Sequence, residues 1–205
     1  MRIVLCDPGA SNVRSVARAI ERAAGRSADV SRDPDTIRRA DVLVVPGQGH
    51  FAAFARAMEG GVGEALLERI RAGVPYLGIC LGLQVLFESS AEAPGAKGLG
   101  VLAGTVVKLD AGLDPETGRP RALPHIGWNA VEPAAGSPIA RAHYYFAHGY
   151  VAAPADASVV AGTTEYGASF PSAIAKDRIL GVQFHPEKSQ RAGLALLECF
   201  FASTR

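Results

Sequence analysis

The sequence predicts an α/β protein built on a largely parallel sheet. In the first half, short apolar and β-branched runs alternate with longer amphipathic stretches, as expected when helices connect parallel strands. Hydrophobic residues make up 48% of the 205 residues. A chain of this length can bury roughly 70% of the surface that its unfolded form exposes. We therefore expect a folded chain, organised as a single domain over residues 1–205.

The elements of that sheet follow one another along the first half. Residues 3–6 form an apolar run that predicts the first strand, and Asn12 is placed to cap a helix that reaches about residue 24. Further elements are expected as a strand over 42–45, a helix over 63–72, a strand over 75–80 and a helix over 81–88.

The second half has a different pattern and is expected to be mostly β. Alternating apolar and polar residues predict strands over 105–109, 144–151, 158–162 and 179–184. A closing helix over 189–201 is expected to bury Ala192, Leu194, Leu197 and either Phe200 or Phe201 on one face. Residues 111–120 predict a mobile loop.

Composition argues against several kinds of partner. Lys and Arg number 21 and Asp and Glu number 20, so a net charge of +1 provides no field that recruits nucleic acid or an anionic membrane. No apolar run reaches the roughly 18 residues of a membrane span. The widely spaced Cys6, Cys80 and Cys199 suit reduced thiols, and no metal-ligand spacing is present. We expect a cytoplasmic protein that binds no metal.

The segment Gly78-Ile79-Cys80-Leu81-Gly82 carries the clearest chemical signal. It has the form of a nucleophile elbow, in which a strained residue between strand and helix needs small neighbours, with sulfur replacing the serine hydroxyl. Cys80 would lie at the amino end of a helix that favours the thiolate, and the Leu81 amide would face an oxyanion. The alternative is a buried cysteine acting as a small apolar residue, which is our interpretation of Cys6 and Cys199.

His185 and Glu187 provide the base and orienting group that a thiol nucleophile needs. If the backbone stays extended beyond the strand ending near Phe184, the two side chains project to the same side. The carboxylate would then hold the imidazole in one tautomer. A His-x-Glu pair is also an ordinary surface arrangement, and the sequence alone leaves open whether His185 meets Cys80.

Together these segments resemble the class I (triad) glutamine amidotransferases. The resemblance rests on Gly78 to Gln84 with His185-Pro186-Glu187, and it spans nearly the whole chain. It implies an α/β/α sandwich with a mostly parallel central sheet and an additional β-rich portion. It also implies that Cys80 is the nucleophile, His185 the general base and acid, Glu187 the orienting carboxylate and Gln84 a glutamine contact, with no cofactor.

Further segments resemble the glutaminase subunits of imidazole glycerol phosphate synthases. They are Pro46-Gly47-Gln48-Gly49, residues 124–129, residues 145–148 and residues 187–190, with Gln48 standing where many relatives have valine. The resemblance implies a second oxyanion donor from the backbone of Gly47, Gln48 or Gly49, and substrate contacts at Gly49 and Tyr145. It implies a partner interface at Asn12, Trp128, His148 and Lys188.

By the same resemblance, the partner is a (β/α) barrel cyclase that accepts ammonia in histidine biosynthesis, and the two chains form a heterodimer. Three alternatives remain: a glutaminase subunit for another acceptor, as in pyridoxal phosphate synthase; a cysteine peptidase on a related fold; and a silent interaction subunit. Trp128 also suits a packing role, Tyr145 and His148 suit ordinary strand positions, and Lys188 suits a solvated charge.

Overall fold

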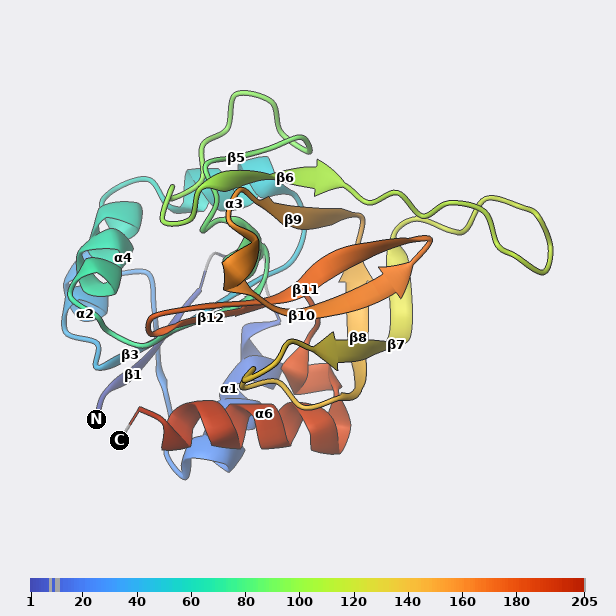
Figure 1. The fold of residues 1–205 in the computed structure, drawn as a ribbon. Helices are drawn as coiled ribbons and strands as arrows, with labels where there is room; N and C mark the ends of the chain where they lie inside the picture. The colour runs from blue at the N-terminus through green and yellow to red at the C-terminus, as the bar shows by residue number, and fades with distance from the viewer. Residues whose placement is uncertain (8, 10–11, 205) are drawn as a thin grey trace.

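A nine-stranded sheet runs through the protein in the computed structural model, which describes residues 1–7, 9 and 12–204 (Figure 1). Its order is β2-β1-β3-β4-β12-β11-β10-β7-β8, with parallel neighbours from β2 to β12 and antiparallel neighbours from β12 to β8. The strands are β1 (Ile3–Cys6), β2 (Asp29–Ser31), β3 (Val42–Gly47), β4 (Tyr76–Cys80), β7 (His125–Pro133), β8 (Ala142–His148), β10 (Val160–Tyr166), β11 (Ala168–Lys176) and β12 (Ile179–Val182).

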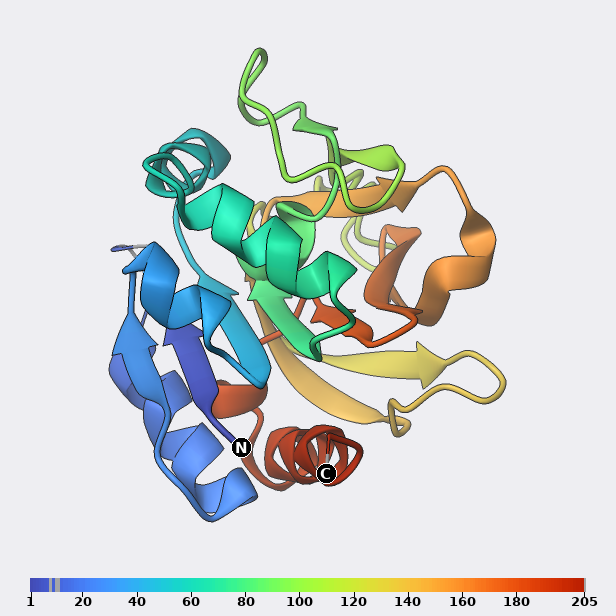
Figure 2. The same cartoon turned by 90° about the vertical axis from the view of Figure 1, so that its left-hand side faces the viewer.

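Helices cover both faces of the parallel half of this sheet (Figures 1 and 2). On one face α1 (Val13–Ala24) packs beside α6 (Gln190–Ala202). On the other lie α2 (Pro34–Arg38), α3 (Phe51–Ala57), α4 (Val62–Arg71) and the one-turn α5 (Leu81–Gln84). The predicted α/β sandwich is thus confirmed.

Two apolar cores result from the alternation of side chains along the strands. In β1, Ile3 and Leu5 pack toward α1 and α6, whereas Val4 and Cys6 pack toward the opposite helices. Because both faces are covered, β1, β3, β4 and β12 are apolar at nearly every position, which explains why the short apolar runs of the sequence predict them well. The parallel edge strand β2 is exposed and largely polar, and it was not predicted.

A second, smaller sheet accounts for the additional β-rich portion. It consists of β5 (Ser89–Ser90), β6 (Gly104–Lys108) and β9 (Tyr150–Pro154), in the order β5-β6-β9. The single strand predicted over 144–151 was wrong, because the chain leaves the large sheet at Gly149 and continues as β9 in the small one. This direct continuity supports the proposal of one domain over residues 1–205.

Several other predicted boundaries differ from the structure. The helix predicted over 81–88 ends at Gln84, because the backbone amides of Leu99 and Val101 take the carbonyls of Val85 and Leu86 that a longer helix would use. The strand predicted over 158–162 begins with a 3₁₀ turn at Ala157–Val159 before β10. Helix α1 does begin after Asn12, but the Asn12 side chain makes no capping hydrogen bond.

The closing helix α6 buries a face slightly different from the predicted one. Gly193, Leu196, Leu197, Phe200 and Phe201 are buried, whereas Ala192 and Leu194 are only partly covered. Residues 111–120 form a projecting loop closed by a bridge between Leu113 and Pro120 (Figure 1). No helix within the described part of the chain is long and apolar enough to cross a membrane.

Candidate active site

Cys80 lies on a tight turn between β4 and α5, at the carboxyl end of the parallel strands. Its backbone has φ +55° and ψ −106°, a strained conformation for a residue with a side chain. A Cβ at Gly82 would stand 1.8 Å from the Val45 carbonyl oxygen, so only glycine fits there. The predicted elbow conformation is confirmed, although the helix dipole contributes less than expected because α5 has a single turn.

The His185–Glu187 pair lies just beyond β12, the parallel neighbour of β4. His185 Nδ1 and Glu187 Oε1 are 2.9 Å apart, and both side chains are 2% exposed. The backbone reason we predicted was wrong: a 3₁₀ turn at Pro186–Lys188, rather than an extended strand, brings the two side chains together. The Tyr145 carbonyl accepts a hydrogen bond from the His185 amide at 2.8 Å and so anchors this segment to β8.

Nearby side chains control the charge of His185. Burial acts to lower its pKa, but the Cys80 and Glu187 side chains outweigh burial and raise the pKa from 6.5 to about 10. His185 Nε2 has no well-directed hydrogen-bond partner among the described residues. With its pKa at about 10, the imidazole is protonated at neutral pH.

Gln183 is a contact of Cys80 that we did not predict from the sequence. Its side chain is fully buried, and Nε2 donates to Cys80 Sγ at 3.5 Å. Gln84 Nε2 donates to Gln183 Oε1 at 3.1 Å and to the Tyr150 carbonyl at 3.0 Å, so the two amides hold each other. The sequence did contain a signal for Gln183, because this polar residue directly follows an apolar strand and precedes His185 by two positions.

A cavity of about 290 Å³ opens beside Cys80. It is lined by Gln48, Gly49, Cys80, Leu81, Gln84, Glu92, Ala147, His148, Gly149 and Tyr150. Gln84 Oε1 is buried without a hydrogen-bond partner among the described residues. Glu92 adds a carboxylate, one oxygen of which accepts the Phe51 amide at 2.8 Å. These acceptors suit a small ligand that carries an ammonium group, and no motif in the sequence pointed to Glu92.

Comparisons with known proteins agree with this geometry. Residues 4–203 match the family described as "Glutamine amidotransferase class-I". The curated "Imidazole glycerol phosphate synthase subunit HisH" of Deinococcus radiodurans is 47% identical, covering 97% of this chain and 92% of the relative. A HisH protein of Thermus thermophilus is 44% identical, covering 96% and 95%. This chain belongs to the class I glutamine amidotransferases, among the HisH proteins.

Solved structures of more distant amidotransferases share the fold. A structure described as "Crystal structure of glutamine amidotransferase" has a TM-score of 0.74 at 21% identity and covers 98% of this chain and 97% of that one. The structure of PurLQS from Thermotoga maritima has a TM-score of 0.73 at 16% identity, covering 100% and 99%.

The structure places the predicted oxyanion residues of this HisH protein around the nucleophile. Leu81, Gln48 and Gly49 line the cavity. Gly47 packs beneath it, where a Cβ would stand 2.6 Å from the Leu81 side chain. Gly49 has φ +99° and open space around it, so its conformation rather than its surroundings requires glycine.

Two predicted roles do not agree with where the residues lie. Tyr145, predicted to contact the substrate, is not among the cavity-lining residues; its ring lies 6.2 Å from that of Trp128 and 5.6 Å from Lys188 Nζ. His148, predicted to face a partner, is 5% exposed and forms part of the cavity wall. Side chains alternate along β8, so Tyr145 and His148 lie on opposite faces of the strand. The substrate contact of Tyr145 and the interface role of His148 stay predictions, which these positions do not favour.

The other predicted interface residues do lie at the surface. Trp128 is 47% exposed, Lys188 is partly exposed, and Asn12 is exposed at the start of α1. Pro8, Ala10 and Ser11, which precede Asn12, lie outside the described residues.

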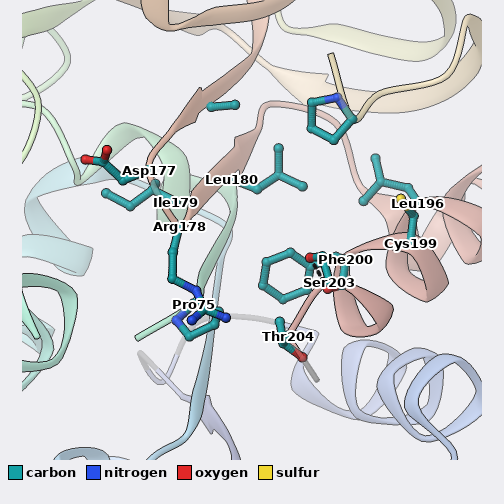
Figure 3. A pocket seen from close by; sticks show the side chains of 12 residues that line it. Pro75, Asp177, Arg178, Ile179, Leu180, Leu196, Cys199, Phe200, Ser203 and Thr204 are labelled. Atoms are coloured by element: carbon teal, nitrogen blue, oxygen red, sulfur yellow. Dashed lines mark hydrogen bonds between the residues drawn. The ribbon is translucent and has the colours of Figure 1, made fainter. Parts of the chain in front are cut away.

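A second cavity of about 290 Å³ lies at the opposite end of the sheet (Figure 3). Pro75, which precedes β4, and Asp177 and Arg178, which connect β11 to β12, belong to its wall, together with the exposed Cys199. Ligands of open α/β sheets bind at the carboxyl ends of the strands, and no histidine lines this cavity. The chemistry therefore belongs to the cavity beside Cys80.

Proposed function

We propose that this HisH protein is the glutaminase subunit of an imidazole glycerol phosphate synthase in histidine biosynthesis, and that it hydrolyses glutamine at Cys80. One observation carries the proposal: the elbow presents Cys80 to a cavity of glutamine size, next to the buried His185–Glu187 pair. Family membership supplies the reaction class.

The first half of the reaction forms a thioester. With the proton held by His185 and the Gln183 amide donating to the sulfur, the Cys80 thiolate attacks the side-chain amide carbon of glutamine. The Leu81 amide, which as the first residue of α5 has no partner within the helix, donates to the developing oxyanion together with an amide of the 47–49 loop. His185 then protonates the leaving nitrogen, the C–N bond breaks, and ammonia departs.

The second half regenerates the enzyme. Neutral His185 takes a proton from water as the water oxygen attacks the thioester carbon, and the C–S bond breaks to release glutamate. The sulfur leaves as thiolate and the imidazole is again protonated, which restores the starting state. Glu187 holds Nδ1 throughout, so that Nε2 stays directed at the reacting atoms.

Glu92 is proposed to bind the α-ammonium group of glutamine. Glu92→Gln removes the negative charge but keeps an acceptor for the Phe51 amide. We expect KM for glutamine to rise by about tenfold or more with little change in kcat, because a charged hydrogen bond to the unreacting end of the substrate is lost. Steady-state glutaminase kinetics check this, with the exposed Glu59→Gln as the matched control. A fall in kcat at unchanged KM would contradict the assignment.

The partner is proposed to be a (β/α) barrel cyclase that docks beside the triad. Ile126 and Trp128 are exposed apolar side chains at 62% and 47%. A hollow between α1 and α6 borders Glu187 and is lined by Arg18, Arg22 and Arg191, which form no ion pair within the described residues. Exposed apolar side chains together with unpaired arginines suit a partner that offers apolar and acidic residues.

The partner is further proposed to complete the oxyanion hole by turning over a peptide of the 47–49 loop. The isolated chain is then expected to bind glutamine but hydrolyse it slowly, and the loaded cyclase to raise turnover by about 10² or more, within reach of one oxyanion donor. Gly49→Val should suppress this stimulation, because a β-branched residue disfavours φ +99° although nothing lies within 4 Å of the new Cβ.

Ammonia release with and without the cyclase measures this effect. Gly25→Val is the matched control, because Gly25 also has positive φ and open surroundings but lies at the end of α1, far along the chain from the loop. Full stimulation of the Gly49 variant, or an isolated chain as fast as the complex, would contradict the loop mechanism.

A further inference from the structure

Two buried histidines behind the glutamine cavity have no role in the mechanism described above. His125 opens β7 and His148 closes β8, and the two residues lie directly opposite each other in the strand pairing. They are 3% and 5% exposed, and His125 Nδ1 lies 3.2 Å from His148 Nε2. Burial lowers the pKa of His125 to about 4 and that of His148 to about 3, so both rings are neutral at pH 7.

The neighbours of the two rings allow only one placement of their protons. His148 Nδ1 lies 3.0 Å from the Tyr150 carbonyl, which can only accept, so Nδ1 carries the proton and Nε2 is bare. His125 must therefore donate from Nδ1 to that bare nitrogen. Its own bare Nε2 accepts from Asn129 Nδ2 at 3.3 Å.

Asn129 is oriented by the backbone. Its Nδ2 also donates to the Glu165 carbonyl at 2.8 Å, and its Oδ1 accepts the Ala130 amide at 2.8 Å. The amide can thus only donate to His125. The hydrogen bonds run in one direction, from Asn129 through His125 and His148 to the Tyr150 carbonyl.

The Tyr150 carbonyl connects these hydrogen bonds to Cys80. Besides His148 Nδ1, the Tyr150 carbonyl accepts Gln84 Nε2 at 3.0 Å. Because a carbonyl cannot donate, Gln84 must turn its nitrogen toward Tyr150, which leaves its oxygen without a hydrogen-bond partner among the described residues. The second proton of that nitrogen holds Gln183 Oε1, and Gln183 Nε2 donates to Cys80 Sγ.

The Tyr150 carbonyl lies at the start of β9, just after the chain passes at Gly149 from one sheet to the other. Pairing of Tyr150 with Lys108 holds the backbone here, and His148 adds a side-chain hydrogen bond to the carbonyl. The His148 ring is itself held by His125, which is stacked on Tyr166 with ring centroids 4.1 Å apart.

We propose that His125 and His148 are positioning residues for glutamine hydrolysis, which hold the Tyr150 carbonyl so that Gln84 presents its oxygen to glutamine and Gln183 stays on the Cys80 sulfur. This inference rests on the proposed glutaminase function. The hydrogen-bonded residues His125 and Asn129 alternate along β7 with the exposed Ile126 and Trp128, so they lie on the opposite face of the same strand. A shift of β7 when a partner docks would therefore reach the Gln84 amide through these hydrogen bonds.

The proton placement can be tested without any activity. Two-bond ¹H–¹⁵N correlation spectra of the isolated wild-type chain should show both histidines as the neutral Nδ1–H tautomer, with no titration between about pH 5 and pH 8. His125→Phe and His148→Phe assign the two signals. An Nε2–H tautomer at either ring, or titration near the ordinary pKa of 6.5, would overturn the inference.

The positioning role is tested by two substitutions of His148. If packing matters most, the Phe variant should be the more active of the two, and if the hydrogen bond matters most, the Asn variant should be. His148→Phe suits the aromatic neighbours Phe146 and Phe170, whose ring centroids lie 5.6 and 5.2 Å away, but loses the donor. His148→Asn packs poorly but keeps an N–H near Nδ1. We expect glutamine-dependent kcat/KM of the complex to fall by about tenfold in the Phe variant and to recover in the Asn variant, despite a lower Tm for Asn.

Synthesis from added ammonium salt should be equal in both variants, because it bypasses the glutamine cavity. An Asn variant no more active than the Phe variant would overturn the positioning role. Absence of glutamine hydrolysis in the wild-type complex would instead overturn the proposed function, and the two failures are thereby distinguished.

Discussion

Cys80→Ala is expected to reduce glutamine hydrolysis by at least about 10⁴-fold, because removal of the nucleophile leaves no route through the thioester. The cavity and the surface beside it are unchanged by the loss of one buried sulfur. The complex should therefore still form imidazole glycerol phosphate from added ammonium salt at close to the wild-type rate. Comparing glutamine-dependent with ammonium-dependent synthesis measures both effects in one preparation.

The other two cysteines provide the controls. Cys199 is exposed and Cys6 is buried, and burial raises the pKa of the Cys6 thiol to about 12, so it does not form a thiolate at neutral pH. Cys199→Ala should leave both activities intact. A glutamine analogue with an electrophilic carbon should label Cys80 alone, and mass spectrometry that finds the label on Cys6 or Cys199, or hydrolysis retained by Cys80→Ala, would contradict the assignment.

His185→Ala is expected to have the second largest effect, a loss of about 10⁴-fold in kcat, with Glu187→Gln at least tenfold less damaging. The imidazole carries out both proton transfers, giving one proton to the leaving nitrogen and taking one from the attacking water, whereas the carboxylate holds the ring and supports its charge across a 2.9 Å contact. Steady-state rates of the complex with saturating glutamine decide the order of the two variants.

His148 lines the cavity beside Cys80, but it is a poor substitute for His185. Burial holds its pKa at about 3, and its two nitrogens are engaged by His125 and the Tyr150 carbonyl. Near-wild-type turnover by His185→Ala would therefore mean that the triad is wrongly assigned, rather than that a neighbour had replaced the base.

The sequence predicted the parallel half of the fold and the local chemistry of the elbow. Buried parallel strands are apolar at nearly every position, and a strand-to-helix elbow needs its two glycines within five residues of chain, so both features are visible locally. The antiparallel half was predicted less well, since its boundaries depend on pairing partners. The break at Gly149 follows from β8 joining one sheet and β9 the other.

The site residues also fall into two groups, those that sequence motifs indicate and those that only the folded chain brings together. Cys80, His185 and Glu187 stood in short recognisable segments, but nothing in the sequence indicated that Gln183 and Gln84 join in a contact with the sulfur. Glu92 also lies in no motif, and it reaches the cavity because its carboxylate caps the start of α3 at Phe51. Such residues are brought together by the packing of separate elements.

By itself, the sequence determined the layered α/β arrangement and indicated a candidate nucleophile and a candidate base, because each depends on residues close together in the chain or on a repeating local pattern. Only the tertiary structure decided which face of β8 each side chain occupies, and so placed the Tyr145 ring beside Trp128 and Lys188 and His148 in the cavity wall. Strand register and burial also set the charge of each histidine: the same imidazole has its pKa raised to about 10 at His185 and lowered to about 3 at His148. These properties depend on neighbours from distant parts of the chain, which meet only when the sheet is assembled.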